Sequence, residues 1–491
     1  MKVLNRGIWQ DLLVILATKF VLVATLLSKF WRKRLLAKIA TKRIHKGQIT
    51  VPQKLLNSLN NKRIADVKKS NLLSYKSKIL TKTVTSFYKL PSLKEGHNKS
   101  LLLVVHNSLP YDAAGYAHRT MHEAKAYQSL GYAVSIVTRQ GYPWDLAKHQ
   151  VVSFKASQIV EGIEIFTITG TRKYKVDSDL KYAIEYGRQV AALAQSLNAG
   201  FIQASSNYIN GLAGYVASRK SGIPFIYEAR GMWHVTRASK EKKFKKTELY
   251  AYEEEIERWV LNNASANIFI TKIMRDKYHG NKLIPTAILQ NCITINKNII
   301  NHSLSEATSI SPFKLLYAGS LVFYEGLEEL IEVVGQLASE SITLDIYGDG
   351  PYKNEIVEKI KRLSSANVTY HGRISSECLR GVYENSHAVV VPRIDCDVTR
   401  MVPPLKPIEA LLYSLPVLTS NLPAIKELTA DLRGIKYTEV KNKELKKGIL
   451  ELRKNYSQYK KNAQLDAKYI SKERTWKSEI KKCISNIVEE C

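Results

Sequence analysis

Residues 400–420, RMVPPLKPIEALLYSLPVLTS, hold a lysine between two prolines and place a glutamate in the next helical turn. Pro407 suits the first position of a helix, because it has no N–H group to leave unpaired there, and it favours an extended conformation at Lys406. Lys406 is not a capping residue, so the first amides of the helix stay open. A fixed ammonium beside an open helix N-terminus suits an anion. The alternative is a solvated lysine, with Glu409 complementing the helix dipole.

The elements that position this stretch follow an alternation of strands and helices, which is typical of a parallel sheet. One series begins at LLLVVH (101–106) and continues through AVSIVTR, FIQAS, FIYEA and ANIFIT. A second series begins at KLLYAGS (314–320) and continues through ITLDIYGDG, NVTYHG, AVVVPR and PVLTS. The sequence therefore predicts an α/β protein with two Rossmann-like, doubly wound domains facing a cleft.

These series give the predicted domain boundaries. Residues 1–98 form a basic helical extension, and residues 99–285 form the first Rossmann-like domain. Residues 286–312 are polar, rich in Asn, Ile and Ser, and are predicted to be a linker. Residues 313–465 form the second Rossmann-like domain, and residues 466–491 form a helix that crosses back to the first.

Positive charge is concentrated at the N-terminus. The 491 residues carry a net charge of +30, and residues 1–100 supply +19 of it through 22 Lys or Arg and three acidic residues. An apolar run from Leu12 to Leu27 is interrupted by Lys19 and is short for a bilayer span of roughly 20 residues. Flanking aromatic residues and a basic tail favour an interfacial helix within residues 8–34, on the anionic inner face of the cytoplasmic membrane. A buried helix and a true span stay open as alternatives.

The motifs of common cofactor and metal sites are missing from the sequence. The five cysteines show neither a CxxC pair nor metal-ligand spacing, which indicates reduced thiols in a cytosolic protein. Doubly wound sheets bind ligands at the carboxyl ends of their strands, and there the chain has the glycine loops DAAG, AGS…EG and YGDG. None matches GxGxxG or GxxxxGK[ST]. We therefore expect no cofactor and no metal.

The second half resembles retaining glycosyltransferases of the GT-B kind, in the large family numbered four (glycosyl transferases group 1). The matching motifs are LLYAGSLVFYEGLEELIEV, LDIYGDGP, NVTYHGRIS, VVVPR, PLKPIEALLYSLPVLTSNLPAIKEL and a late RTW. The first half is similar to a subgroup that carries PLKP, through GYAHRT, VTRQGYPWD and FIYEARGMWHVTRAS. The resemblance covers roughly residues 100–480. It implies transfer of a sugar from a UDP- or GDP-linked donor to a glycan or lipid-linked acceptor in surface polysaccharide biosynthesis.

The resemblance also implies which residues hold the donor. Cations on the diphosphate oxygens stabilise the leaving group, and we expect Arg393 and Lys406 to supply them, because the loop 319–326 lacks them. Glu409 would hold the donor ribose, as the second glutamate of the family's Glu-seven-residues-Glu motif. The other expected donor-binding residues are Gly319, Ser320, Gly348, Gly350, Arg373, Leu405 and Pro407. In the first domain the cleft is expected to include Gly115, Tyr116, Glu228 and Arg230.

The sequence departs from the family pattern at three places. Met401 stands where the first glutamate of the motif should fall, and Arg400 stands where relatives with PLKP often carry a glutamate. Gln203 stands where family members commonly have a histidine. These departures put the sugar contacts in doubt and leave room for an unusual donor or for loss of activity.

Other interpretations of the sequence stay open. The triplets DSD (177–179) and DCD (395–397) suggest a metal-dependent GT-A site, but GT-A folds lack a second Rossmann half, and DSD precedes a helix that it can cap. A nucleotide-sugar epimerase or hydrolase could use the same fold. A non-catalytic protein could bind membranes or nucleic acid through its basic end. Because residues 32–98 hold few aromatic residues for base stacking, we expect no nucleic acid.

Overall fold

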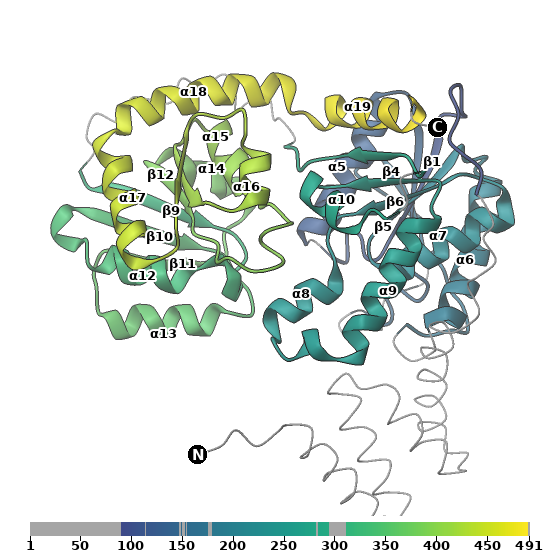
Figure 1. The fold of residues 1–491 in the computed structure, drawn as a ribbon, viewed down its shortest axis with the longest axis horizontal. Helices are drawn as coiled ribbons and strands as arrows, with labels where there is room; N and C mark the ends of the chain where they lie inside the picture. The colour runs from purple at the N-terminus through teal and green to yellow at the C-terminus, as the bar shows by residue number, and fades with distance from the viewer. Residues whose placement is uncertain are drawn as a thin grey trace, which may run out of the picture.

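The computed structural model describes residues 90–112, 114–146, 149, 153, 155–174, 179–280, 283–293 and 311–489. Two α/β domains lie side by side, and the C-terminal helices span both of them (Figure 1). The predicted α/β class with two doubly wound domains is confirmed. The predicted interfacial helix and most of the basic extension fall outside the described residues. Within the described part of the chain, no helix has the length and apolar character that crossing a bilayer requires.

The first domain is built on an eight-stranded sheet with the strand order β3-β4-β2-β1-β5-β6-β7-β8. Neighbouring strands are parallel except for β3 and β4, which form an antiparallel pair. The strands are β1 (Ser100–Val105), β2 (Ala133–Thr138), β3 (Ser157–Val160), β4 (Ile163–Phe166), β5 (Phe201–Ser205), β6 (Phe225–Ala229), β7 (Ala266–Phe269) and β8 (Thr286–Ile288). Its central strands are buried along almost their whole length, because helices cover both faces.

The helices of the first domain follow the strands in alternation. They are α5 (Gly115–Ser129), α6 (Asp179–Ser196), α7 (Tyr208–Ser221), α8 (Trp233–Lys240), α9 (Glu248–Asn263) and α10 (Lys272–Tyr278). The side chain of Asn207 caps α7, and Thr247 caps α9, each accepting a hydrogen bond from a backbone amide of the first turn. Helices α6 and α7 pack on one face of the sheet, and α5 packs on the other.

The second domain is built on a six-stranded parallel sheet with the order β11-β10-β9-β12-β13-β14. The strands are β9 (Phe313–Ala318), β10 (Ile342–Tyr347), β11 (Val368–Gly372), β12 (Ala388–Val391), β13 (Val417–Ser420) and β14 (Ile435–Thr438). Its helices are α12 (Leu327–Gly335), α13 (Lys353–Leu363), α14 (Ser376–Glu384), α15 (Lys406–Leu412), α16 (Pro423–Leu428) and α17 (Asn442–Lys454). Ala318 pairs with Tyr347, so the loops after β9 and β10 leave the sheet side by side.

Two C-terminal helices connect the domains. Helix α18 (Tyr456–Glu473) packs on α15 of the second domain, and α19 (Trp476–Glu489) packs on α5 and β8 of the first (Figure 1). Trp476 and Ile480 of α19 are buried in the same hydrophobic cluster as Leu101 and Met121. The end of the chain therefore belongs to the core of the first domain.

Several elements differ from the sequence prediction. Residues 286–288, assigned to the linker, form β8 at the edge of the first sheet. Three residues are too few to show a strand pattern, which explains the misplaced boundary. The β3–β4 pair and the edge strand β14 were also not predicted, because their short polar–apolar alternation resembles that of loops. Helix α15 begins at Lys406 itself, one residue earlier than expected.

Candidate functional site

Arg393 and Lys406 meet around a carboxylate. Arg393 follows β12, Lys406 begins α15, and Glu325 ends the short 3-10 helix η3 (Phe323–Glu325). The Arg393 Nε atom lies 3.1 Å from Glu325 Oε1, and Lys406 Nζ lies 2.8 Å from Oε2. The two cations therefore hold the two oxygens of one anionic group, at the carboxyl edge of the second sheet.

Glu325 is an ionised group in a buried position. Its side chain is only 5 % exposed, and the Tyr317 hydroxyl also donates to Oε2 at 3.2 Å. Burial alone would raise the pKa of this carboxyl, but Lys406 and Arg393 outweigh burial and hold the pKa below its ordinary value. From the sequence we predicted that this loop lacks cations, but not that it supplies the carboxylate between them. The feature of the sequence that could have indicated this role is Glu325 itself, an acidic residue beside Gly326 in the loop where the family pattern has basic residues.

Aromatic rings and a backbone carbonyl hold the cations in place. The Arg393 guanidinium lies 5.2 Å from the centre of the Tyr324 ring, and the Lys406 ammonium lies 4.9 Å from that of Tyr317. Arg393 Nη1 also donates to the carbonyl of Val402 at 2.6 Å. The Lys406 side chain is 13 % exposed and that of Arg393 only 5 %. Lys406 is therefore the more accessible of the two.

The glycine loops after β9 and β10 leave room for Lys406. At Gly319, with φ +154°, a Cβ atom would lie 2.2 Å from Lys406 Cε. At Gly348, with φ +142°, a Cβ atom would lie 1.8 Å from the carbonyl oxygen of Gly319. Glycine is required at both positions, because any side chain would push the loops apart or displace the lysine. Gly350 also lies against the loop after β9, because a Cβ atom there would lie 2.3 Å from the carbonyl oxygen of Leu321.

The other predicted donor-binding residues differ in their exposure to solvent. Glu409 lies in the first turn of α15, where burial raises its pKa although Lys406 and a hydrogen bond from Tyr383 act against the shift. Leu405 precedes the helix without a side-chain cap, and Pro407 is buried. Two further predicted residues are exposed at the carboxyl ends of strands, Ser320 after β9 and Arg373 after β11.

The loop that joins the two cations is anchored on the first domain. Val398 and Met401 are buried in the hydrophobic cluster of that domain, and Thr271 Oγ1 donates to the carbonyl of Met401 at 2.9 Å. Asn291 Nδ2 donates to the carbonyl of Pro403 at 3.1 Å. Because its ends carry Arg393 and Lys406, the loop ties the position of the cation pair to the arrangement of the two domains.

Each departure from the family pattern has a structural partner. Met401 packs between the domains, as described above. Arg400 forms an exposed ion pair with Asp395 at 2.5 Å. Gln203 is fully buried, accepts a hydrogen bond from the Tyr127 hydroxyl at 2.8 Å and donates to Glu228 at 3.1 Å. Met401 and Gln203 therefore belong to the packed interior, whereas the exposed pair of Arg400 contributes little to stability.

The DCD triplet is neutralised by cations. Asp395 pairs with Arg400, and Asp397 pairs with Lys245 of the first domain at 2.5 Å. The hydrogen bonds from these partners lower the pKa of both carboxyls. Residues 177 and 178 of the DSD triplet lie outside the described residues. In the part of the chain that is described, no three His, Cys, Asp or Glu side chains are grouped as a metal site.

Glu228 and Arg230 lie inside the first domain. Arg230 contacts Glu228 at 2.8 Å and Glu123 at 2.5 Å, and Arg119 contacts Glu228 at 2.9 Å. Burial, with repulsion from Glu228, raises the pKa of Glu123 to about 8 although both arginines act against the shift. Glu228 is fully buried and Arg230 is 9 % exposed. Both side chains are therefore held by other side chains of the first domain, and their expected place on the acceptor side of the cleft stays a prediction. They form an ion cluster, because their strand end is covered by α5 and α19.

Gly115 and Tyr116 begin α5 at the carboxyl end of β1. The Tyr116 hydroxyl accepts a hydrogen bond from the His106 amide at 2.9 Å, and burial raises its pKa to about 12. A Cβ atom on Gly115 would meet nothing within 4 Å. The space that a donor was expected to need there is therefore open, and its use stays a prediction.

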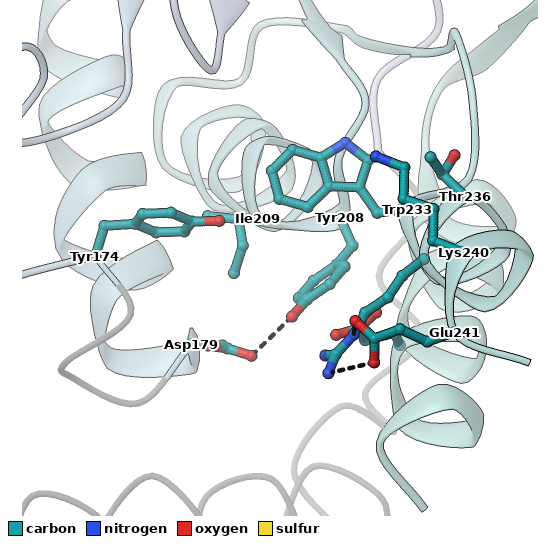
Figure 2. Close-up of a pocket in the computed structure, with 10 residues that line it drawn as sticks. Tyr174, Asp179, Tyr208, Ile209, Trp233, Thr236, Lys240 and Glu241 are labelled. Carbon is teal, nitrogen blue, oxygen red and sulfur yellow. Dashed lines mark hydrogen bonds and ion pairs between the residues drawn. The ribbon is translucent and has the colours of Figure 1, made fainter. Parts of the chain in front are cut away.

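A pocket of about 580 Å³ lies in the first domain beyond these residues. It is lined by the first residues of α6 and α7, by α8 along its length and by one residue of α9, and Trp233 and Tyr208 contribute aromatic rings to it (Figure 2). No role was predicted from the sequence for Trp233. A large aromatic residue shortly after a buried strand could have indicated it.

Both domains of the chain match models of known protein families. Residues 305–469 match the family model described as glycosyl transferases group 1, and residues 114–289 match the glycosyl transferase 4-like domain. A comparison with the curated proteins found no match.

Solved structures share the fold at low sequence identity. A sucrose-phosphate synthase from Thermosynechococcus elongatus has a TM-score of 0.60 at 14% identity, covering 79% of this chain and 97% of that one. Anabaena Alr3699/HepE, solved with UDP and glucose, has a TM-score of 0.56 at 16% identity, covering 79% and 100%. The lipopolysaccharide outer core galactosyltransferase WaaB has a TM-score of 0.54 at 12% identity, covering 79% and 99%.

Proposed function

Because the chain is a glycosyltransferase of the GT-B fold, we propose that it moves a sugar from a UDP- or GDP-linked donor to a glycan or lipid-linked acceptor. The anomeric configuration is retained, no metal ion takes part, and the product belongs to surface polysaccharide biosynthesis. Support for the donor class comes from HepE, which was solved with UDP and glucose, and support for the acceptor class comes from the galactosyltransferase WaaB.

The observation that carries the proposal is the pair of cations that converges on one anionic group. Negative charge grows on the diphosphate as the glycosidic bond breaks, and fixed cations stabilise that charge most in a site that excludes water. Arg393 and Lys406 already hold the two oxygens of Glu325 at 3.1 and 2.8 Å. Their spacing suits two oxygens of a diphosphate in the same way.

Each residue of the centre has its own task in this proposal. Lys406, the more exposed cation, meets the diphosphate, and Arg393 supports it from deeper in the site. Glu325 stays behind them as the counter-ion that fixes their positions. Glu409 accepts hydrogen bonds from the ribose hydroxyls, and Gly319 keeps the space through which the lysine side chain passes.

The reaction itself can be tested with purified protein. A panel of UDP- and GDP-sugars is screened for turnover with a lipid-linked glycan fraction as acceptor, in EDTA, and the product linkage is determined by NMR. We expect full rate in EDTA and a retained configuration. An inverted product, or an absolute requirement for Mn²⁺, contradicts the proposal. Release of free sugar without any acceptor product would make the protein a hydrolase.

Membrane attachment rests on the sequence alone. Each basic residue near an anionic surface contributes about 1 kcal/mol, and residues 1–100 carry 22 of them. We expect the full chain to bind anionic liposomes in preference to a single-stranded oligonucleotide, and to be only partly released by high salt. Full release by salt alone would argue against an inserted apolar helix.

A further inference from the structure

The pocket of the first domain combines an exposed aromatic face with several polar groups. Its volume of about 580 Å³ is within the range of small-ligand sites. Figure 2 shows the Trp233 indole above Tyr208, with Tyr174 and Asp179 on one side and Lys240 and Glu241 on the other. The pocket lies beyond the carboxyl ends of β5 and β6, the edge at which doubly wound sheets bind ligands.

Trp233 provides a platform in this pocket. Its side chain is 39 % exposed, and it is one of two large aromatic residues with that degree of exposure in the described part of the chain. The His106 ring meets it edge-on, with ring centres 4.9 Å apart and planes at 82°. The indole is therefore held in one orientation while a large part of its surface remains open to a ligand.

The polar groups around the platform favour a neutral ligand with many hydroxyls. The lining contains three carboxylates, of Asp179, Glu241 and Glu253, but only two cations, Arg237 and Lys240. Arg237 is already paired with Glu241 at 3.3 Å. A diphosphate would meet net negative charge here. A pyranose ring fits better, because its C–H face can pack on the indole and its hydroxyls can pair with the charged rim.

A short series of contacts links the pocket to the cation pair of Arg393 and Lys406. Arg393 Nη1 holds the Val402 carbonyl at 2.6 Å, and Val402 Cγ2 lies 3.9 Å from the Cβ position of Gly231. Trp233 follows two residues later, a distance of at most about 7 Å along the chain. Beyond α8, Lys245 pairs with Asp397 of the same loop at 2.5 Å. Contacts with the second domain thus lie both before and after α8, the helix that begins with Trp233.

We propose that this pocket binds a pyranose ring of the acceptor glycan, stacked on Trp233. The inference rests on the proposed function, since it identifies the acceptor site of the same reaction. It assigns Trp233 to recognition of a neutral sugar and leaves the diphosphate to Arg393 and Lys406.

The test uses saturation-transfer NMR on the full chain. The probes are the methyl pyranosides of glucose, galactose, mannose and N-acetylglucosamine. We expect at least one probe to bind wild type through the C–H protons of one ring face. Trp233→Ala should weaken that binding by about tenfold or more, and Trp233→Phe should weaken it less. Tyr469→Ala is the matched control, because Tyr469 is 38 % exposed and lies on α18, away from the pocket.

The outcomes separate this inference from the proposed function. The inference is overturned if none of the probes binds, or if Trp233→Ala retains affinity within about twofold of wild type. Binding of UDP and GDP is titrated into the same variants and should not change in Trp233→Ala. If nucleotide binding is intact while glycoside binding is absent, only the acceptor assignment fails. If neither nucleotide binds wild type, the proposed function fails instead.

Discussion

The Lys406 ammonium donates a hydrogen bond to Glu325 Oε2 at 2.8 Å, across 81 residues of sequence. The contact places a carboxylate of one glycine loop behind the lysine that begins α15. It gives the lysine a fixed position before any ligand arrives. The solvated-lysine interpretation is therefore wrong, since the side chain is only 13 % exposed and is paired.

Replacing the counter-ion should cost both stability and function. Glu325→Gln leaves Arg393 and Lys406 without a buried negative charge, and breaking such a pair costs about 3–5 kcal/mol. We expect a lower free energy of unfolding in urea and turnover reduced by about tenfold or more, because the cations lose their fixed spacing. Glu329→Gln, on the outer side of α12, serves as control and should match wild type. Unchanged turnover in Glu325→Gln would show that the carboxylate does not position the cations.

A methyl group on Gly319 should displace the side chain of Lys406. The new Cβ atom would lie 2.2 Å from Lys406 Cε, and φ of +154° is strained for any side chain. We expect Gly319→Ala to weaken UDP or GDP binding to about the extent that Lys406→Ala does. Gly381→Ala is the matched control, because a Cβ atom there meets nothing within 4 Å in α14. Equal nucleotide affinity in Gly319→Ala and Gly381→Ala would count against a role for the lysine.

The interface between the domains should depend on Met401. Its side chain is 3 % exposed and packs in the hydrophobic cluster of the first domain. Met401→Ala should reduce the free energy of unfolding by about 2–5 kcal/mol through the cavity that it leaves. Met401→Leu should cost less than about 1.5 kcal/mol. Urea denaturation measures both, and an equal effect of the two changes would argue against tight packing at this contact.

Glu257 should make stability depend on pH. It is 1 % exposed and accepts a hydrogen bond from Tyr227, and burial raises its pKa from 4.5 to about 8. The folded state then binds a proton that the unfolded state releases above pH 4.5. Its contribution to stability is complete below that pH, falls by up to about 1.4 kcal/mol per pH unit as pH rises, and is lost above about pH 8.

The measurement compares wild type with a variant that cannot titrate. Urea denaturation of Glu257→Gln between pH 5 and 8 should show a shallower fall in stability than wild type. Glu255→Gln changes an exposed carboxylate of the same helix and should follow the wild-type curve. Parallel curves for wild type and Glu257→Gln would mean that Glu257 is already ionised in the folded protein.

The sequence predicted the fold well because local patterns encode it. The buried strand β1 is an almost continuous apolar run, and the residues around Lys406 identify a helix start. The family resemblance also indicated that Arg393 and Lys406 act together, and both lie in the connection that follows β12. Short edge strands were not predicted, because three or four residues carry too little periodicity.

The parts of the site that the sequence could not give depend on long-range contacts. Glu325 lies 81 residues before Lys406, and no local pattern relates them. The burial of Glu228 and Arg230 likewise follows from packing by α5 and α19, which are distant in sequence. Charge type at one position can be read from a sequence, but whether that charge faces a ligand or another side chain requires the fold.

The central claim is that Lys406 holds the donor diphosphate, and one titration tests it directly. Uridine, UDP, guanosine and GDP are titrated by calorimetry into wild type, Lys406→Ala and Lys426→Ala, a control lysine that also lies over a tyrosine ring. We expect Lys406→Ala to lose at least about tenfold in affinity for the diphosphate. Its affinity for the nucleoside should stay close to wild type, and Lys426→Ala should change neither. Diphosphate binding by Lys406→Ala at wild-type affinity would contradict the account, and with it the role of Arg393.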